Sequence, residues 1–176
     1  MDAQQALKRL KNGNEAYLGN GQFTGDVGKE KRATLTQGQH PYAVVLTCAD
    51  SRVVPEAIFG AGLGELFVVR VAGNVVDDAT LGSIEYAVAH LGAKTVVVLG
   101  HTSCGAVAAA LAGELHGKVG HLTRRIVANL QGVRRPEAAC RLNATAGAKA
   151  LQKALGEEAT VVAALYDIQT GEVEWL

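Results

Sequence analysis

The sequence predicts an α/β protein whose parallel β-sheet is covered by helices on both faces. Short apolar runs of strand length recur along the chain, and segments with helical patterning separate them. A length of 176 residues suits a single domain. The composition, with 48% hydrophobic and 19% charged residues, is typical of a soluble globular protein.

The first 41 residues are predicted to form a helix and an irregular connection. The apolar side chains of the helix fall near one face: Ala6, Leu7, Leu10, Tyr17 and Leu18. Residues 19–41 are rich in glycine and polar residues. This connection is either a flexible tail or an arm laid over a partner, and the sequence pattern favours neither interpretation.

From residue 42 onward, strand and helix patterns alternate. The apolar, β-branched runs predict strands at 42–47, 65–72, 94–100, 160–167 and 172–176. The segments between them predict helices at 54–60, 77–92, 105–113, 120–133 and 143–156. Pro55 suits the first turn of the first of these helices. Asp77 or Asp78 caps the second, and Gly92 ends it.

The charge balance and the cysteine content limit the classes of function. Seventeen basic and 17 acidic residues cancel, which argues against a nucleic-acid groove or a membrane-binding face. The first 19 residues are polar and lack the apolar core of a signal peptide, so we predict a cytoplasmic protein. In that reducing compartment, three cysteines are expected to be ligands, nucleophiles or core residues rather than disulfides.

Two of the predicted strands are followed directly by residues of the types that bind metals or take part in catalysis. Cys48, Asp50 and Arg52 follow the strand at 42–47, whereas His101 and Cys104 follow the strand at 94–100. Ligands of open α/β sheets gather outside the carboxyl ends of the strands, where a parallel pairing would bring these side chains together. Cys104 also stands at a predicted helix N-terminus, which favours a thiolate.

Two cysteines and one histidine suit a zinc ion. Three protein ligands leave one tetrahedral position open, as in catalytic zinc sites. Asp50 could fill that position or stand beside it, held by a two-pronged ion pair with Arg52. Spacing alone leaves a second interpretation open, in which Cys48 is a nucleophile and His101 its base. The remaining cysteine, Cys140, is interpreted as a small buried apolar residue.

The two motifs "CADSRV" at 48–53 and "GHTSCGAV" at 100–107 resemble those of the β-class carbonic anhydrases, and the likeness covers residues 36–112. The resemblance implies that Cys48, His101 and Cys104 bind one Zn²⁺ per chain. It also implies that Asp50 and Arg52 form the family's carboxylate–arginine pair, which either frees the fourth zinc position or lets the aspartate close it.

The same resemblance implies a substrate pocket. Gln39 matches a glutamine that hydrogen-bonds substrate, Phe67 and Tyr86 match aromatic positions of the pocket, and Ala72 matches a small or branched apolar position. His90 matches a residue proposed as a proton shuttle. The alternative interpretations are a loop amide for Gln39, core aromatics for Phe67 and Tyr86, and a solvated helix histidine for His90.

One departure from the family pattern concerns an inhibitory bicarbonate site. Members with that site have tryptophan three residues before the first ligand cysteine, whereas this chain has Val45. Together with Gln39, this difference points to the open-site group of the family. The arginine of the inhibitory site does have a counterpart in Arg70.

The family fold implies a four-stranded parallel sheet, an additional C-terminal edge strand, and an N-terminal helical arm that embraces a second copy in an obligate dimer or a larger assembly of dimers. Residues 1–176 would then form one domain, with the arm at 1–35, the zinc-site core at 36–112 and C-terminal elements at 113–176. The implied activity is reversible hydration of carbon dioxide by zinc-bound hydroxide. Hydrolysis of carbonyl sulfide or carbon disulfide is the alternative, and a zinc-binding protein without catalysis is a further one.

Overall fold

The computed structural model describes residues 1–19 and 21–176, and of Asn20 the backbone alone. Its centre is a five-stranded sheet in the order β2-β1-β3-β4-β5. The first four strands are parallel, and β5 runs antiparallel to β4. The predicted parallel sheet with a C-terminal edge strand is therefore confirmed. The strands are β1 (Ala43–Thr47), β2 (Leu66–Arg70), β3 (Thr95–His101), β4 (Thr160–Tyr166) and β5 (Val173–Trp175).

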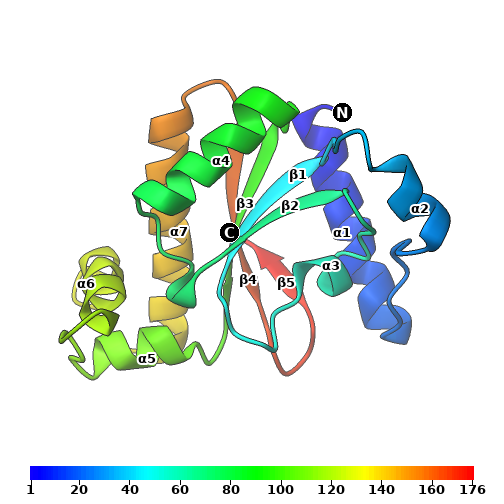
Figure 1. Cartoon of the computed structure of the whole chain (residues 1–176). Helices are drawn as coiled ribbons and strands as arrows, with labels where there is room; N and C mark the ends of the chain where they lie inside the picture. Colours follow the sequence, from blue (N-terminus) through cyan, green and yellow to red (C-terminus); the bar gives the residue numbers. More distant parts are fainter.

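Helices cover both faces of this sheet, with α4 and α7 on one side and α1 and α3 on the other (Figure 1). Among the described residues, none of these helices combines the length and the hydropathy that a bilayer-spanning segment requires. The helices are α1 (Ala3–Asn20), α2 (Lys29–Thr34), α3 (Pro55–Ile58), α4 (Asp78–Leu91), α5 (Gly105–Leu111), α6 (Val119–Leu130) and α7 (Pro136–Leu155), with a 3-10 turn η1 (Ala72–Asn74) after β2.

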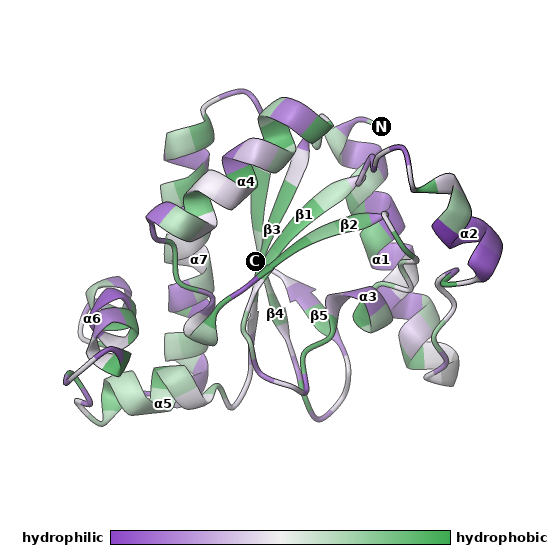
Figure 2. Ribbon diagram, in the orientation of Figure 1, coloured by the Kyte–Doolittle hydropathy of each residue, from purple (hydrophilic) through white to green (hydrophobic). Residues whose placement is uncertain are grey.

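The central strands β1 and β3 are buried along their whole length, and they are apolar except at their ends because helices cover both of their faces (Figure 2). In β1, Val44 and Leu46 pack toward α4 and α7, whereas Ala43 and Val45 pack toward α1 and α3. This alternation follows from the two-residue repeat of a strand. A third cluster lies at the carboxyl ends of the strands, under α5, α6 and the start of α7.

The predicted ends of α4 are confirmed. The Asp77 side chain accepts a hydrogen bond from the Thr80 N–H, and Gly92 ends the helix in the left-handed conformation at φ +73°. This cap fixes the direction in which α4 leaves the loop after η1.

Two helices differ from the sequence prediction. The helix predicted at 143–156 begins at Pro136, whose ring suits the first helical turn, so it is longer by about two turns. The connection at 19–41 contains α2, which has no buried residue among those described. Without an apolar face, α2 gives no periodic signal that a sequence reading could detect.

The first helix, α1, packs against one face of the sheet of its own chain. Ala6 and Leu10 are fully buried against the face of β1 and β3. Asn14 ties the same helix to the end of the chain, because its amide donates to the Gly171 carbonyl and accepts from the Val173 N–H. The helix α2 lies at the outer edge of the molecule, beyond α1 (Figure 1), and buries none of its described residues.

Replacing Leu10 by alanine should therefore lower the free energy of unfolding by about 2–5 kcal/mol, the usual cost of emptying a fully buried leucine site. Leu18→Ala on the same helix is the matched control, because Leu18 is 45% exposed and its loss should cost about 0.5 kcal/mol or less. Urea denaturation measures both. Equal, small losses would contradict the packing of α1 described above.

Candidate metal centre

The strand register brings the two predicted clusters to one edge of the sheet. Thr47, the last residue of β1, pairs with Leu99 of β3, and the Thr47 hydroxyl donates to the Leu99 carbonyl at 2.8 Å. Cys48 follows directly on one strand, and His101 ends the other two residues beyond Leu99. Residues 53 positions apart in the sequence therefore become neighbours, as the parallel pairing predicted.

Cys48, His101 and Cys104 each offer one ligand atom, and these three atoms lie within 4.8 Å of one another. The two sulfurs are 4.0 Å apart, and all three side chains are buried. Cys104 reaches this position because the chain turns sharply at Ser103, whose φ of +56° is unusual for a residue with a side chain. Cys104 then stands immediately before α5.

The ring of His101 is oriented to present one free nitrogen to the two sulfurs. Its Nδ1 lies 2.8 Å from the Thr102 carbonyl, which can only accept, so Nδ1 carries the proton. The lone pair is then on Nε2, which is buried and has no hydrogen-bond partner among the described residues. A buried acceptor beside two thiols, with its other nitrogen fixed by a carbonyl, is the arrangement expected of a zinc-binding histidine. The donor set therefore fits zinc.

The sulfurs of Cys48 and Cys104 are hydrogen-bonded to each other. The hydrogen bond from Cys104 lowers the pKa of Cys48 to about 4, and the same contact raises the pKa of Cys104 above its usual range. Amides of the first turn of α5 lower the pKa of Cys104, as expected at a helix N-terminus, but the contact with Cys48 and the burial of the thiol have larger effects. A divalent cation bound between the two sulfurs would favour ionisation of both.

Asp50 and Arg52 form the predicted two-pronged pair. The Arg52 Nε and one terminal nitrogen donate to the two carboxylate oxygens at 3.0 and 2.8 Å, and the Arg52 backbone N–H also donates to the carboxylate at 3.0 Å. These bonds hold the pKa of Asp50 well below its usual range. The carboxylate Oδ2 lies 4.0 Å from the His101 Nε2, so an ionised acceptor stands beside the three ligand atoms.

Two further residues brace this centre, and the sequence analysis gave neither of them that role. Arg70 donates to the carbonyls of Cys48 and Asp50, at 3.3 and 2.7 Å, and thereby holds the backbone of the ligand loop. The Gly73 N–H donates to the Cys48 sulfur at 3.3 Å. Their sequence signal was their position at and after the end of β2, beside the predicted Ala72, which precedes Gly73 in η1.

The predicted aromatic residues lie together but apart from the three ligand atoms. The Phe67 ring packs on Tyr86 with centroids 6.4 Å apart, and Tyr86 packs on His90 at 5.1 Å. Phe67 pairs with Val44, four residues before Cys48, which is about 13 Å along the strand. Tyr86 is 51% exposed, so it is a surface residue and not a core aromatic.

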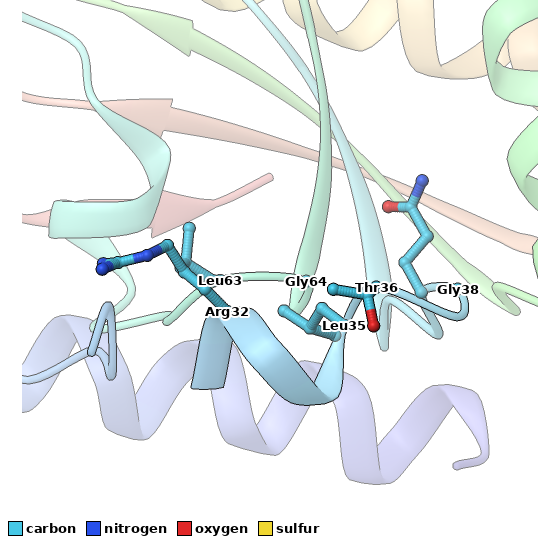
Figure 3. Close-up of a pocket in the computed structure, with 7 residues that line it drawn as sticks. Arg32, Leu35, Thr36, Gly38, Leu63 and Gly64 are labelled. Atoms are coloured by element: carbon cyan, nitrogen blue, oxygen red, sulfur yellow. The ribbon is translucent and has the colours of Figure 1, made fainter. Parts of the chain in front are cut away.

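Gln39 lies near the opposite end of β1 from Cys48. The five residues of that strand span about 16 Å. Gln39 lines a pocket of 510 Å³ formed by the end of α2 and the turn before β2. The other residues around this pocket, labelled in Figure 3, are Arg32, Leu35, Thr36, Gly38, Leu63 and Gly64.

Cys140 is buried in α7, in the same apolar cluster as Cys48 and Cys104, and burial raises the pKa of its thiol. It is not one of the three residues whose ligand atoms converge. Its interpretation as a small buried residue agrees with this environment. All three cysteines, which lie within the described part of the chain, are free thiols.

Comparisons with known proteins identify the family to which this chain is similar. The family described as carbonic anhydrase matches residues 43–173. A carbonic anhydrase of Mycolicibacterium smegmatis is 53% identical over 114 residues, which are 65% of this chain and 55% of that protein. Carbonic anhydrase 2 of Mycobacterium tuberculosis is 55% identical over 107 residues, which are 61% of this chain and 52% of that protein. The chain spans about half the length of these curated relatives.

Solved structures agree with it along nearly the whole chain. The β-carbonic anhydrase CafA of Aspergillus fumigatus superposes with a TM-score of 0.73 at 30% identity, over 98% of this chain and 89% of that one. A tetrameric β-carbonic anhydrase of Sordaria macrospora gives 0.72 at 28% identity, over 98% and 97%. Since the family match covers most of the sequence and the fold agrees around it, the chain belongs to the β-class carbonic anhydrases.

Proposed function

We propose that this chain is a zinc lyase that catalyses the reversible hydration of carbon dioxide to bicarbonate and a proton. The observation that carries the proposal is the convergence of two buried sulfurs and a free imidazole nitrogen beside an ionised carboxylate. Family membership and the carbonic anhydrases at 53 and 55% identity support the same activity. Cys48, His101 and Cys104 would hold the ion.

When bound, zinc supplies the Lewis acidity that lets a water molecule react as a nucleophile near neutral pH. The protein must then orient that nucleophile. Asp50 is suited to this task because its carboxylate accepts hydrogen bonds and stays ionised. Arg52 fixes the carboxylate in place, and its contact with the Ser103 carbonyl at 3.3 Å links the two ligand loops. A fixed acceptor would aim the nucleophile's lone pair at the substrate carbon.

Carbon dioxide is apolar, so it needs an apolar slot and a polar group for its developing charge. Ala72, next to the centre, would form one wall of this slot, and Phe67 and Tyr86 would form others. Gln39 would donate its amide N–H to a substrate oxygen. His90, which stacks on Tyr86 at the surface, would pass the released proton to buffer.

We infer that a second copy of the chain completes the slot. Within one chain, Gln39, Phe67 and Tyr86 are too far from Cys48 to contact a shared substrate. The edge strand β2 carries Phe67, and Tyr86 is exposed beside it, so both are available to a partner. The β-carbonic anhydrases of Sordaria macrospora are described as tetrameric, which supports a homodimer or a larger assembly of dimers.

Mixing two impaired variants tests this assembly. Cys104→Ser removes a metal ligand, and Gln39→Ala removes a substrate contact. If the site takes one residue from each chain, mixed dimers should regain turnover that neither variant has alone, measured after the two are unfolded and refolded together. An unchanged, low turnover in the mixture, or a monomer in analytical ultracentrifugation, would rule out a shared site.

A second substrate class uses the same residues. A carbon disulfide hydrolase shares the fold at 19% identity, a level that speaks for the fold alone. Stopped-flow hydration of carbon dioxide and parallel assays with carbonyl sulfide and carbon disulfide separate the two activities. We expect carbon dioxide to be turned over by far the fastest. A protein that carries zinc but turns over none of these gases would instead be a zinc-binding protein without catalysis.

A cytoplasmic location remains a prediction. Free thiols at all three described cysteines are typical of a reducing compartment.

A further inference from the structure

We propose that Asn143 is a positioning residue of the metal centre. It would fix Gly73 so that the Gly73 N–H points at the Cys48 sulfur, and in this way it would set how strongly that sulfur donates charge to the metal. The inference rests on the proposed metal site and is independent of which gas is the substrate.

Gly73 adopts a conformation that only glycine fits at this place. Its φ of +72° is left-handed, and a Cβ there would lie 2.6 Å from the Ile126 Cδ1 and 3.1 Å from the Ala106 Cβ. The tight packing lets its N–H approach the Cys48 sulfur to 3.3 Å. Glycine also has the freest backbone of all residues, so the direction of this N–H depends on what holds the turn.

Asn143, which lies in α7, fixes this turn through its side-chain amide. Its Nδ2 donates to the Gly73 carbonyl at 2.8 Å, and its Oδ1 accepts from the Asn129 amide of α6 at 2.9 Å. The orientation of the Asn143 amide is unambiguous, because a carbonyl can only accept. The Asn74 N–H, in the same peptide unit as the Gly73 carbonyl, donates to the Val71 carbonyl at 3.0 Å. Both polar groups of the peptide after Gly73 are therefore fixed.

The burial of Asn143 supports a positioning role for its hydrogen bond to the Gly73 carbonyl. Its side chain is 1% exposed, on a face of α7 that otherwise packs Ala139, Ala144 and Gly147. A buried amide is costly unless it is hydrogen-bonded, and an alanine there would pack without that requirement. The chain of contacts from Asn129 through Asn143 and Gly73 ends on a metal-ligand sulfur.

An N–H that donates to a thiolate withdraws part of its charge. Without this hydrogen bond, the Cys48 sulfur would keep more of its charge, which moves its charge-transfer band to longer wavelength, and it would be held less firmly in the position of a metal ligand. Outer residues that orient metal ligands typically change metal affinity by about 10- to 100-fold when they are replaced. A merely structural asparagine would change stability and leave the electronic properties of the sulfur unaltered.

Two variants and a matched control separate these roles. Asn143→Leu keeps the size of the side chain and removes both hydrogen bonds. Asn129→Ala removes only the outer contact, at a half-buried position that should tolerate it. Asn14→Leu is the control, because Asn14 is also a buried asparagine, 5% exposed and bonded to three backbone groups, but it joins α1 to α3 and the last strand.

Each purified protein is measured in two ways that do not use catalysis: the rate of zinc transfer to an excess of a chelator, and the sulfur-to-cobalt charge-transfer band of the Co²⁺-substituted protein. Asn143→Leu should release zinc about 10- to 100-fold faster and shift the band to longer wavelength. Asn129→Ala should change both in the same direction by less. Asn14→Leu should lower the Tm and leave both metal measurements at their wild-type values.

Wild-type zinc release and an unshifted band in Asn143→Leu would overturn the proposal, as would equal changes in Asn14→Leu. If Asn143→Leu does not fold, Asn129→Ala decides, and wild-type values there overturn the proposal too. A wild-type protein that binds no metal would overturn both this inference and the proposed function. A wild-type protein that binds zinc but does not hydrate carbon dioxide would remove the proposed function alone, since the two metal measurements would still decide the role of Asn143.

Discussion

Replacing Cys104 by serine should give a folded protein that no longer retains zinc. The alcohol of serine does not ionise near neutral pH, so the centre would lose one of two thiolates and the charge balance that holds a divalent cation. Replacing an outer residue of a metal site typically costs about 10- to 100-fold in affinity, and losing a ligand should cost more. Metal analysis after dialysis against a chelator measures the effect.

Cys140→Ser is the matched control. Cys140 is 3% exposed and lies in the same apolar cluster, but its sulfur is not among the converging ligand atoms. We expect this variant to keep one zinc per chain. Full zinc occupancy in Cys104→Ser would break the ligand assignment, and loss of zinc in both variants would point to general damage of the cluster.

Asp50→Asn should keep zinc and lose turnover by about 10²-fold or more. An amide is nearly the same size as the carboxylate, but it offers one acceptor in place of two and carries no charge. The fork of bonds from Arg52 would be broken, and the group beside the His101 Nε2 would no longer be a fixed anion. Stopped-flow measurement of kcat/KM, on protein of measured zinc content, tests this expectation.

Asp78→Asn makes the same chemical change at an exposed position in the first turn of α4. It should leave turnover at the wild-type level. If Asp50→Asn is as active as Asp78→Asn, then Asp50 does not orient the nucleophile and the proposed mechanism is wrong.

The sheet could be predicted from the sequence because each central strand is short, β-branched and buried on both faces. The two ends of α4 could also be predicted, since Asp77 and Gly92 are strong local signals for the start and the end of a helix. The start of α7 could not be predicted because Pro136 suits a turn as well as the first position of a helix. The helix α2 could not be predicted because it buries no residue and its sequence has no apolar period.

Only part of the metal centre could be predicted from the sequence. Residue types suited to zinc followed two strands, and parallel pairing was sufficient to bring Cys48 and His101 together. The bracing contacts of Arg70, Gly73 and Asn143 depend on side-chain directions that no local pattern encodes. The lone Asn143 on an otherwise small and apolar helix face was the one signal that could have marked it. The separation of Gln39 from Cys48 likewise emerges only from the strand geometry.

A zinc titration of protein stripped of metal by a chelator measures whether this chain needs one bound ion to hydrate carbon dioxide. Carbon dioxide hydration is followed by stopped flow as measured amounts of zinc are added. We expect the rate to rise in proportion to bound zinc and to level off at one ion per chain, and we expect no response from Cys104→Ser. A chain that carries one zinc and fails to accelerate hydration at any pH, or a metal-free chain that is equally fast, would contradict it.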